Sequence, residues 1–212
     1  MLTFALDPST ASPSLALVRD ESPIAELWLA PEPGSGRRVL EAAHGLLTAA
    51  GLDARALDAI VVGVGPGGFT GLRIGLATAL GLGQALGIPV TGASSLEALA
   101  LGIAGECPDG VLVVPVQDAR RRELFAAVYR SRAGGLVELI APVAIAAPDL
   151  AARLEALGEP AWIGGEGVAP SAGRAGPLGT AGPPAPGRAA PSASTTAPGP
   201  PPAASPAMRS NP

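Results

Sequence analysis

The chain has 212 residues, with 29 Gly, 24 Pro, 14 basic and 18 acidic residues, and a formal net charge of −4. A negative chain has no overall attraction to nucleic acid, so contact with RNA would need a local basic patch. The single Cys107 excludes an internal disulfide framework and fits a reducing compartment. We find neither a membrane-length apolar run nor a signal-peptide pattern, so we expect a cytoplasmic protein without a membrane partner.

The first segments predict the opening of a mixed sheet. Residues 2–6, 13–18 and 24–29 are short apolar runs separated by polar turns, which is typical of an antiparallel meander. Asp7 ends the first run, either as a turn-forming residue or as an acid aimed at a phosphate or its metal. Residues 38–50 have helical spacing. This helix carries His44, the only histidine, which has no partners at metal-ligand spacing.

An apolar strand at 59–64, a glycine-rich turn and a helix at 70–86 form the centre of the chain, with Thr70 as the expected N-cap. One face of this helix has small residues: Gly71, Gly75, Ala79 and Gly83. The neighbouring face has large apolar ones: Leu72, Leu76, Leu80 and Leu82. Each helical glycine costs about 1 kcal/mol against alanine, so we interpret the small face as a surface for close approach of another helix. A helix apolar nearly all round is buried in its own core, in a partner, or in both.

The second half repeats the alternation of strands and helices. We expect strands at 88–90, 111–116, 123–129, 136–140 and 161–163, and helices at 94–104 and 148–157. Ser94 and Glu97 form a capping box at the start of the first of these helices. The pattern predicts α/β structure with mixed sheets, as an N-terminal lobe at 1–105 and a second, incomplete lobe at 106–168. Residues 169–212 are rich in Pro, Ala and Gly, and we expect them to be disordered.

The glycine-rich turn at 65–71, GPGGFTG, has two open interpretations. It is not a P-loop, because that motif needs a Lys after its last glycine and the chain has no Lys. Its backbone N–H groups could still hold an anion. Alternatively, the glycines form a tight turn between strand and helix. The sequence has no recognisable nucleophile and base pair, which disfavours independent proteolysis.

Four motifs carry a family resemblance over residues 1–168. Residues 65–75, GPGGFTGLRIG, closely resemble the GPGSFTGLRIG signature of the bacterial TsaB family of threonylcarbamoyladenosine biosynthesis. Residues 92–100, GASSLEALA, look like the next motif of that family. Asp7-Pro-Ser-Thr and Asp118-Ala-Arg are similar to its motifs at the starts of the two lobes. The long motif is specific, and the others occur in the expected order.

The resemblance implies an actin-like ATPase fold of the ribonuclease H-like class. It implies a non-catalytic subunit that pairs with a TsaD homologue and a TsaE homologue and reaches tRNA only through that complex. We expect no catalytic residue, no metal and no cofactor of its own, with ATP or ADP bound only within the complex. The implied partner interface, which could also form a homodimer, is on the helix Thr70–Leu86: Gly71, Leu72, Gly75, Leu76, Ala79 and Leu82. A vestigial phosphate site would use Asp7, Gly67, Gly68 and Thr70.

Three departures from the family pattern accompany the resemblance. Gly68 stands where the family usually has Ser, which removes a hydroxyl donor from the loop. Arg37-Arg38 is followed by Val39-Leu40 instead of His-Ser/Ala-Glu, and the Pro-rich tail replaces a final helix, for which a frameshift is one explanation. Two alternatives stay open: a nucleotide-dependent kinase or ATPase using Asp7 and residues 67–70, and a glycoprotease-like peptidase.

Overall fold

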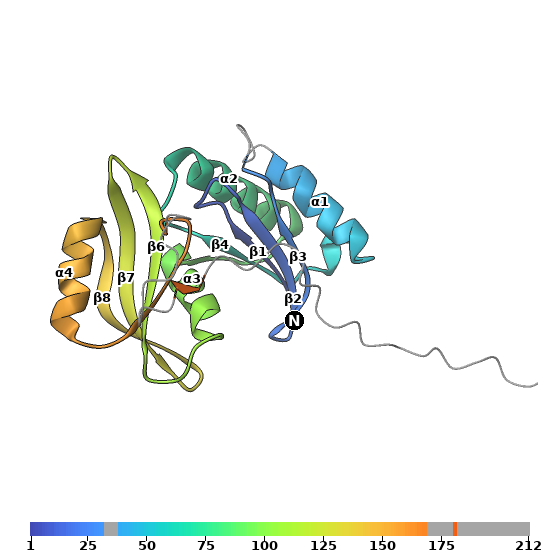
Figure 1. The fold of residues 1–212 in the computed structure, drawn as a ribbon. Helices are drawn as coiled ribbons and strands as arrows, with labels where there is room; N and C mark the ends of the chain where they lie inside the picture. Colours follow the sequence, from blue (N-terminus) through green and yellow to red (C-terminus); the bar gives the residue numbers. More distant parts are fainter. Residues whose placement is uncertain (32–37, 169–179, 182–212) are drawn as a thin grey trace, which may run out of the picture.

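The computed structural model describes residues 1–31, 38–168 and 180–181. They form two β-sheets with helices packed against them, which confirms the α/β class with mixed sheets (Figure 1). Apart from Pro31 and residues 180–181, the loop expected at 31–36 and the tail at 169–212 lie outside the described residues. Within the described ranges, no helix combines the length and the apolarity that a membrane crossing requires.

The first sheet opens with the antiparallel meander that the sequence predicts. Its strands are β1 (Leu2–Asp7), β2 (Ser14–Arg19), β3 (Ser22–Trp28), β4 (Ala59–Gly63) and β5 (Val90–Ala93). They lie in the order β3-β2-β1-β4-β5, with β4 and β5 parallel to β1. Burial alternates along β1 and β2, so one face of the sheet belongs to the core and the other is only half-buried.

Helices α1 (Val39–Ala49) and α2 (Phe69–Leu86) cover the core face of this sheet (Figure 1). The buried residues of α1 follow helical spacing: Val39, Ala43, Leu46 and Leu47. The chain leaves the helix at Gly51, which has a φ of +67°, a conformation that favours glycine. A short 3₁₀ turn, η2 (Ala54–Ala56), leads into β4.

The second sheet repeats the strand order of the first. Its strands are β6 (Leu112–Arg120), β7 (Glu123–Arg132), β8 (Gly135–Ala146), β9 (Ala161–Gly164) and β10 (Thr180–Ala181). From the meander edge they lie in the order β8-β7-β6-β9-β10, with β6, β7 and β8 antiparallel and β9 and β10 parallel. Two sheets with this same order form the actin-like arrangement that the family resemblance implies.

Helices α3 (Ser95–Ala104) and α4 (Ala147–Leu157) cover opposite faces of the second sheet. Leu96 of α3 packs in a cluster with Val113, while Leu150 of α4 packs with Val114 on the other side. Although α3 falls within residues 1–105, which the sequence assigns to the first lobe, its buried side chains pack on the second sheet. It therefore lies between the two sheets (Figure 1).

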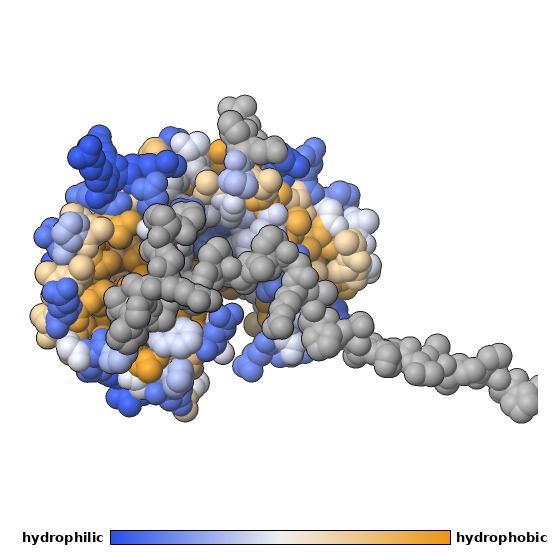
Figure 2. Space-filling view, in the orientation of Figure 1, coloured by the Kyte–Doolittle hydropathy of each residue, from blue (hydrophilic) through white to orange (hydrophobic). Residues whose placement is uncertain are grey.

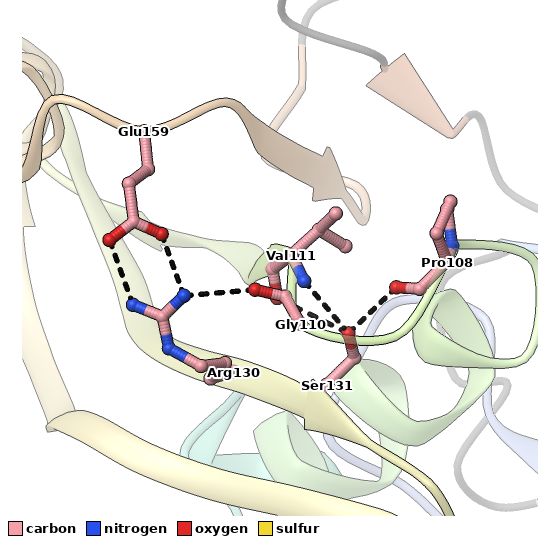
Figure 3. A network of polar contacts seen from close by, with 6 residues as sticks. All are labelled: Pro108, Gly110, Val111, Arg130, Ser131 and Glu159. Carbon is pink, nitrogen blue, oxygen red and sulfur yellow. Dashed lines mark hydrogen bonds and ion pairs between the residues drawn. The ribbon is translucent and has the colours of Figure 1, made fainter.

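A polar network anchors the segment that joins α3 to β6 (Figure 3). Buried Ser131 accepts a hydrogen bond from the N–H of Val111 at 3.2 Å and donates to the carbonyl oxygen of Pro108 at 2.8 Å. The neighbouring Arg130 donates to the carbonyl oxygen of Gly110 and to both carboxylate oxygens of Glu159, at 2.6 and 3.0 Å. These contacts satisfy the backbone of the connecting segment and hold it against β7.

The structure corrects several expected boundaries. Helix α2 begins at Phe69 with Gly68 as its N-cap, so Thr70 lies inside the first turn and is not the cap. Strand β5 spans Val90–Ala93 instead of residues 88–90, because it pairs with residues 60–63 of β4. Strand β6 continues to Arg120 because its last residues pair with β7. Ser94 is confirmed as the N-cap of α3, because its hydroxyl oxygen accepts a hydrogen bond from the N–H of Glu97 at 3.3 Å.

Candidate functional site

Polar residues of both lobes gather in the cleft between the two sheets. Two neighbouring cavities, of about 640 and 550 Å³, open there. The larger one is lined by the glycine-rich turn and by the end of β6, and the smaller one by the half-buried face of the first sheet and by α3. Both include Thr10 and Glu166, so the two cavities meet at these residues.

Asp7 holds the floor of the cleft together through hydrogen bonds to its own chain. Its Oδ1 accepts from the N–H of Ser9 at 2.9 Å and from the hydroxyl of Ser95 at 3.0 Å. The Ser95 oxygen in turn accepts from the N–H of Gly65 at 3.3 Å. A Cβ on Gly63 would lie 2.5 Å from Asp7 Oδ1, so only glycine fits at this point. The bond from the Ser9 N–H is the turn contact that the first interpretation of Asp7 expects, while a role toward a phosphate or metal stays a prediction.

The glycine-rich turn packs tightly on the loop between β1 and β2. The N–H of Gly68 donates to the carbonyl oxygen of Ser9 at 2.7 Å, and a Cβ on Gly67 would lie 2.6 Å from Ser9 Cβ. Gly67, Gly68 and Thr70 line the larger cavity, whereas Asp7 lines only the smaller one. The four residues of the expected phosphate site are therefore close in the fold but do not face one shared cavity.

The second lobe contributes the tip of the β6–β7 hairpin to the larger cavity. Arg120, Arg121 and Arg122 are exposed and have φ values of +66°, +51° and +68°. Asp118 Oδ1 accepts from the N–H of Arg120 at 2.7 Å, and the two side chains form an ion pair at 3.6 Å. Figure 2 shows this end of the hairpin as a strongly hydrophilic projection at the upper left. The three arginines form a local basic patch, and the acidic Asp118 and Glu123 adjoin it.

Glu166 stands at the mouth of both cavities. Partial desolvation raises the pKa of its carboxyl, and the nearby charges of Asp118 and Asp7 raise it further, while Arg120 opposes them. Ser9, Ser95, Gln117 and Glu166 are the residues of the cleft that the sequence interpretation misses. The signal for Ser95 and Gln117 was their position: each is a polar residue at one end of an apolar segment, and these segments come together in a fold with two sheets.

The small-residue face of α2 lies against its own lobe. A Cβ on Gly71 would lie 2.5 Å from the carbonyl oxygen of Pro8, and one on Gly75 would lie 2.5 Å from Pro8 Cβ. Ala79 is fully buried, and a Cβ on Gly83 would overlap Val90. The expectation that this face receives another helix is therefore corrected, because the loop after β1 and strand β5 already occupy it.

The remaining residues expected at the partner interface are partly buried. Leu76 and Leu82 pack against the core of the first lobe, and Leu72 lies beside Gly65. The opposite side of α2 faces solvent and carries Phe69 and Leu80, which are 74% and 58% exposed. We call the residues on that side the outer α2 face: Phe69, Arg73, Ala77, Leu80 and Gly81. Among the described residues no His, Cys, Asp and Glu side chains form a group able to hold a metal ion, and His44 is exposed.

Comparison with known proteins agrees with this fold. A sequence model of the TsaD family, described as tRNA N6-adenosine threonylcarbamoyltransferase, matches residues 35–164. The tRNA threonylcarbamoyladenosine biosynthesis protein TsaB of Bacillus subtilis is 37% identical over 67% of this chain, and that of Escherichia coli is 33% identical over 64%. The chain belongs to the TsaB family. It spans 60% of the B. subtilis relative and 58% of the E. coli relative.

Solved structures of the same family share the architecture. YeaZ from Pseudomonas aeruginosa is 31% identical with a TM-score of 0.60, and the alignment covers 68% of this chain and 66% of that one. A second structure, of a protein with similarity to peptidase YeaZ from P. aeruginosa, is 29% identical with a TM-score of 0.67. That alignment covers 77% of this chain and 74% of the other. The likeness therefore extends over both lobes of the chain.

Proposed function

We propose that this TsaB-family chain serves in threonylcarbamoyladenosine biosynthesis as a non-catalytic partner of a TsaD homologue, with a TsaE homologue as a further component. The relatives named for this pathway, at 37% and 33% identity, support the pathway. A binding role, as opposed to a catalytic one, has structural support because the residues of the expected site are hydrogen-bonded within their own chain. Asp7 holds Ser9 and Ser95, and the N–H of Gly68 holds Ser9.

The outer α2 face is the observation that carries the proposal. Phe69 and Leu80 expose large apolar surfaces on the same side of the helix, and the guanidinium of Arg73 lies 5.4 Å from the centre of the Phe69 ring. Ala77 and Gly81, beside Leu80 on this face, are small and exposed, and nothing lies within 4 Å of the position a Gly81 Cβ would take. A partner helix could therefore approach the outer face closely while burying the two large side chains.

Replacing Leu80 with Asp tests this interface. In the full chain, Leu80→Asp should weaken binding to a purified TsaD homologue by at least about tenfold, because a desolvated charge would enter an apolar contact. Leu101→Asp is the matched control, since Leu101 is 50% exposed on α3 and lies off this face. Titration calorimetry gives the affinities, and circular dichroism checks folding. Wild-type affinity in the Leu80→Asp variant would overturn the interface.

The same variant separates the homodimer from the heteromeric complex. If two copies associate through α2 when the TsaD homologue is absent, sedimentation should show a dimer that Leu80→Asp converts to a monomer. If wild type is monomeric and still binds the TsaD homologue, the outer α2 face serves only that partner. A tRNA that binds to the complex but not to the chain alone would support indirect tRNA contact.

Nucleotide binding is the second candidate, and one observation favours it. Gly67, Gly68 and Thr70 line the larger cavity together with the cationic Arg120, which could face a phosphate. Calorimetry with Mg-ATP and Mg-ADP on the chain alone and on the complex tests this candidate. Binding that needs the complex would support a nucleotide held at the assembled interface, and binding by the chain alone would favour an ATPase or kinase.

A further inference from the structure

The smaller cavity of the cleft has a charge pattern opposite to that of a phosphate site. Three carboxylates line it, those of Asp7, Glu26 and Glu166, and no Arg or His is among the described residues of its lining. Its walls come from the half-buried face of the first sheet and from α3, which lies between the two sheets (Figure 1). The negative charges of these carboxylates repel a phosphate from this cavity and attract a cation.

A buried amide at the base of this cavity is only half satisfied. Gln117 is 4% exposed, and its Nε2 donates to the hydroxyl oxygen of Ser9 at 3.3 Å. Its Oε1 is buried and has no hydrogen-bond partner in the part of the chain that the structure describes. Buried polar atoms are nearly always paired, so an acceptor left open on the lining of a cavity indicates a donor supplied from outside.

The neighbouring carboxylate is also open on one side. Both hydrogen bonds of Asp7 reach Oδ1, and Oδ2 accepts none from the described residues. Gln117 Oε1 and Asp7 Oδ2 are therefore acceptors left open on two residues of the lining, which also includes the exposed carboxylates of Glu26 and Glu166. A group with several N–H donors and a positive charge satisfies this set of acceptors.

Hydroxyl side chains and apolar side chains make up the rest of the lining. Ala5, Ala16, Val61 and Ala98 form walls beside Leu99, and Trp28 is 51% exposed at the edge. An aliphatic or flat apolar body would be buried against these walls. The indole face of Trp28 offers a further favourable surface to a cation.

We propose that this cavity binds a small organic cation, namely an ammonium or guanidinium group carried on an apolar stem. The head group donates to Gln117 Oε1 and Asp7, and the stem packs between the first sheet and α3. Glu166 and Glu26 attract the cation at the mouth. The inference does not depend on the proposed partner function, because it rests on the chemistry of this cavity alone.

Three probes of one shape test the proposal. Pentylammonium carries the cation, pentanol is its neutral counterpart and pentanoate is the anion. The chain has two Trp residues, so Trp162→Phe leaves Trp28 as the only indole to report binding at the cavity edge. We expect pentylammonium to bind at least about tenfold more tightly than pentanol, to weaken as salt is added, and pentanoate not to bind.

Two variants assign the binding to named groups. Gln117→Leu removes the open acceptor while keeping a similar volume, and should weaken pentylammonium by about tenfold or more. Glu166→Gln changes only an exposed rim carboxylate, so folding is not in question, and it should weaken the same probe several-fold. Glu138→Gln is the control, because this exposed residue of β8 lies outside the cavity lining.

Three results would overturn the proposal. They are equal affinity for pentylammonium and pentanol, unchanged affinity in both Gln117→Leu and Glu166→Gln, and no Trp28 signal up to about 10 mM pentylammonium, a range in which even weak specific binding is detected. A chain that binds pentylammonium but fails to bind a TsaD homologue would support this cavity and contradict the partner function. A chain that binds a TsaD homologue but fails to bind pentylammonium would support the partner function and contradict this cavity.

Discussion

The two lobes share one strand order but carry different polar side chains on or beside their central strands. In each lobe a glycine-rich turn after the fourth strand lies against the first strand or the loop that follows it: Gly67 on Ser9, and Gly167 on Val116 through a 3.2 Å hydrogen bond. In the first lobe the carboxylate Oδ1 of Asp7 is paired twice, whereas in the second lobe Gln117 Oε1 is unpaired among the described residues. The repeated topology therefore fixes where backbones meet, and the side chains decide whether a site stays open.

The lobes also differ in how their sheets are covered. The first sheet has α1 and α2 on one face and turns its other face to the cleft, while the second sheet has a helix on both faces. The extra cover, α3, comes from the chain of the first lobe. The second lobe should therefore depend on a segment that precedes it, and three substitutions test how far this difference goes.

The largest effect should come from Leu96→Ala, which removes the fully buried contact of α3 with the second sheet. Truncating a buried leucine costs about 3 kcal/mol of unfolding free energy, through lost transfer energy and a cavity. Urea unfolding followed at Trp162, which packs against this cluster, measures the cost. Leu101→Ala, at a half-exposed position of the same helix, should change stability by less than about 0.5 kcal/mol. Equal effects of the two variants would contradict the assignment of α3 to the second lobe.

Gly75→Ala should have the next largest effect and should act on the first lobe. The added methyl would meet Pro8, and overpacking of this kind costs about 1–3 kcal/mol. Gly81→Ala on the same helix has open space and should instead stabilise by about 0.5–1 kcal/mol. Thermal unfolding of both variants measures the difference. Stabilisation by Gly75→Ala would show that the small face is not closed by its own lobe.

Glu159→Gln should have the smallest effect, confined to the second lobe. The side-chain hydrogen bonds from Arg130 lower the pKa of Glu159 below its ordinary value of 4.5. A carboxyl with a lowered folded-state pKa stabilises the fold above the unfolded pKa, and this contribution is lost as the pH falls through the lowered value. The variant should therefore have a slightly lower urea midpoint than wild type near neutral pH, and an equal one in acid. Glu155→Gln, an exposed carboxylate of α4 without an ion pair among the described residues, should show no such pH-dependent difference.

Much of the fold follows from local patterns. The short apolar runs at 2–6 and 13–18, separated by a polar turn, predicted a meander, and the helical spacing of residues 38–50 predicted α1. The Ser94 capping box located the start of α3. Boundaries were less exact because they depend on pairing: β6 extends to Arg120 only because β7 runs beside it. The vestigial phosphate site was only partly predictable, since nothing local tells that Asp7 and Gly67 would line different cavities.

The sequence by itself determined that α2 has a face of small residues, and that something approaches this face closely. Only the tertiary structure decided what approaches it, placing Pro8 and Val90 there and leaving Phe69 and Leu80 outside. The physical reason is that helical periodicity sets which residues share a face, whereas the neighbour of that face is set by contacts between distant segments. The same reason explains Gln117: it follows the strand expected at 111–116, and only the packing of distant segments buries it on the lining of the smaller cavity, with Oε1 unpaired among the described residues.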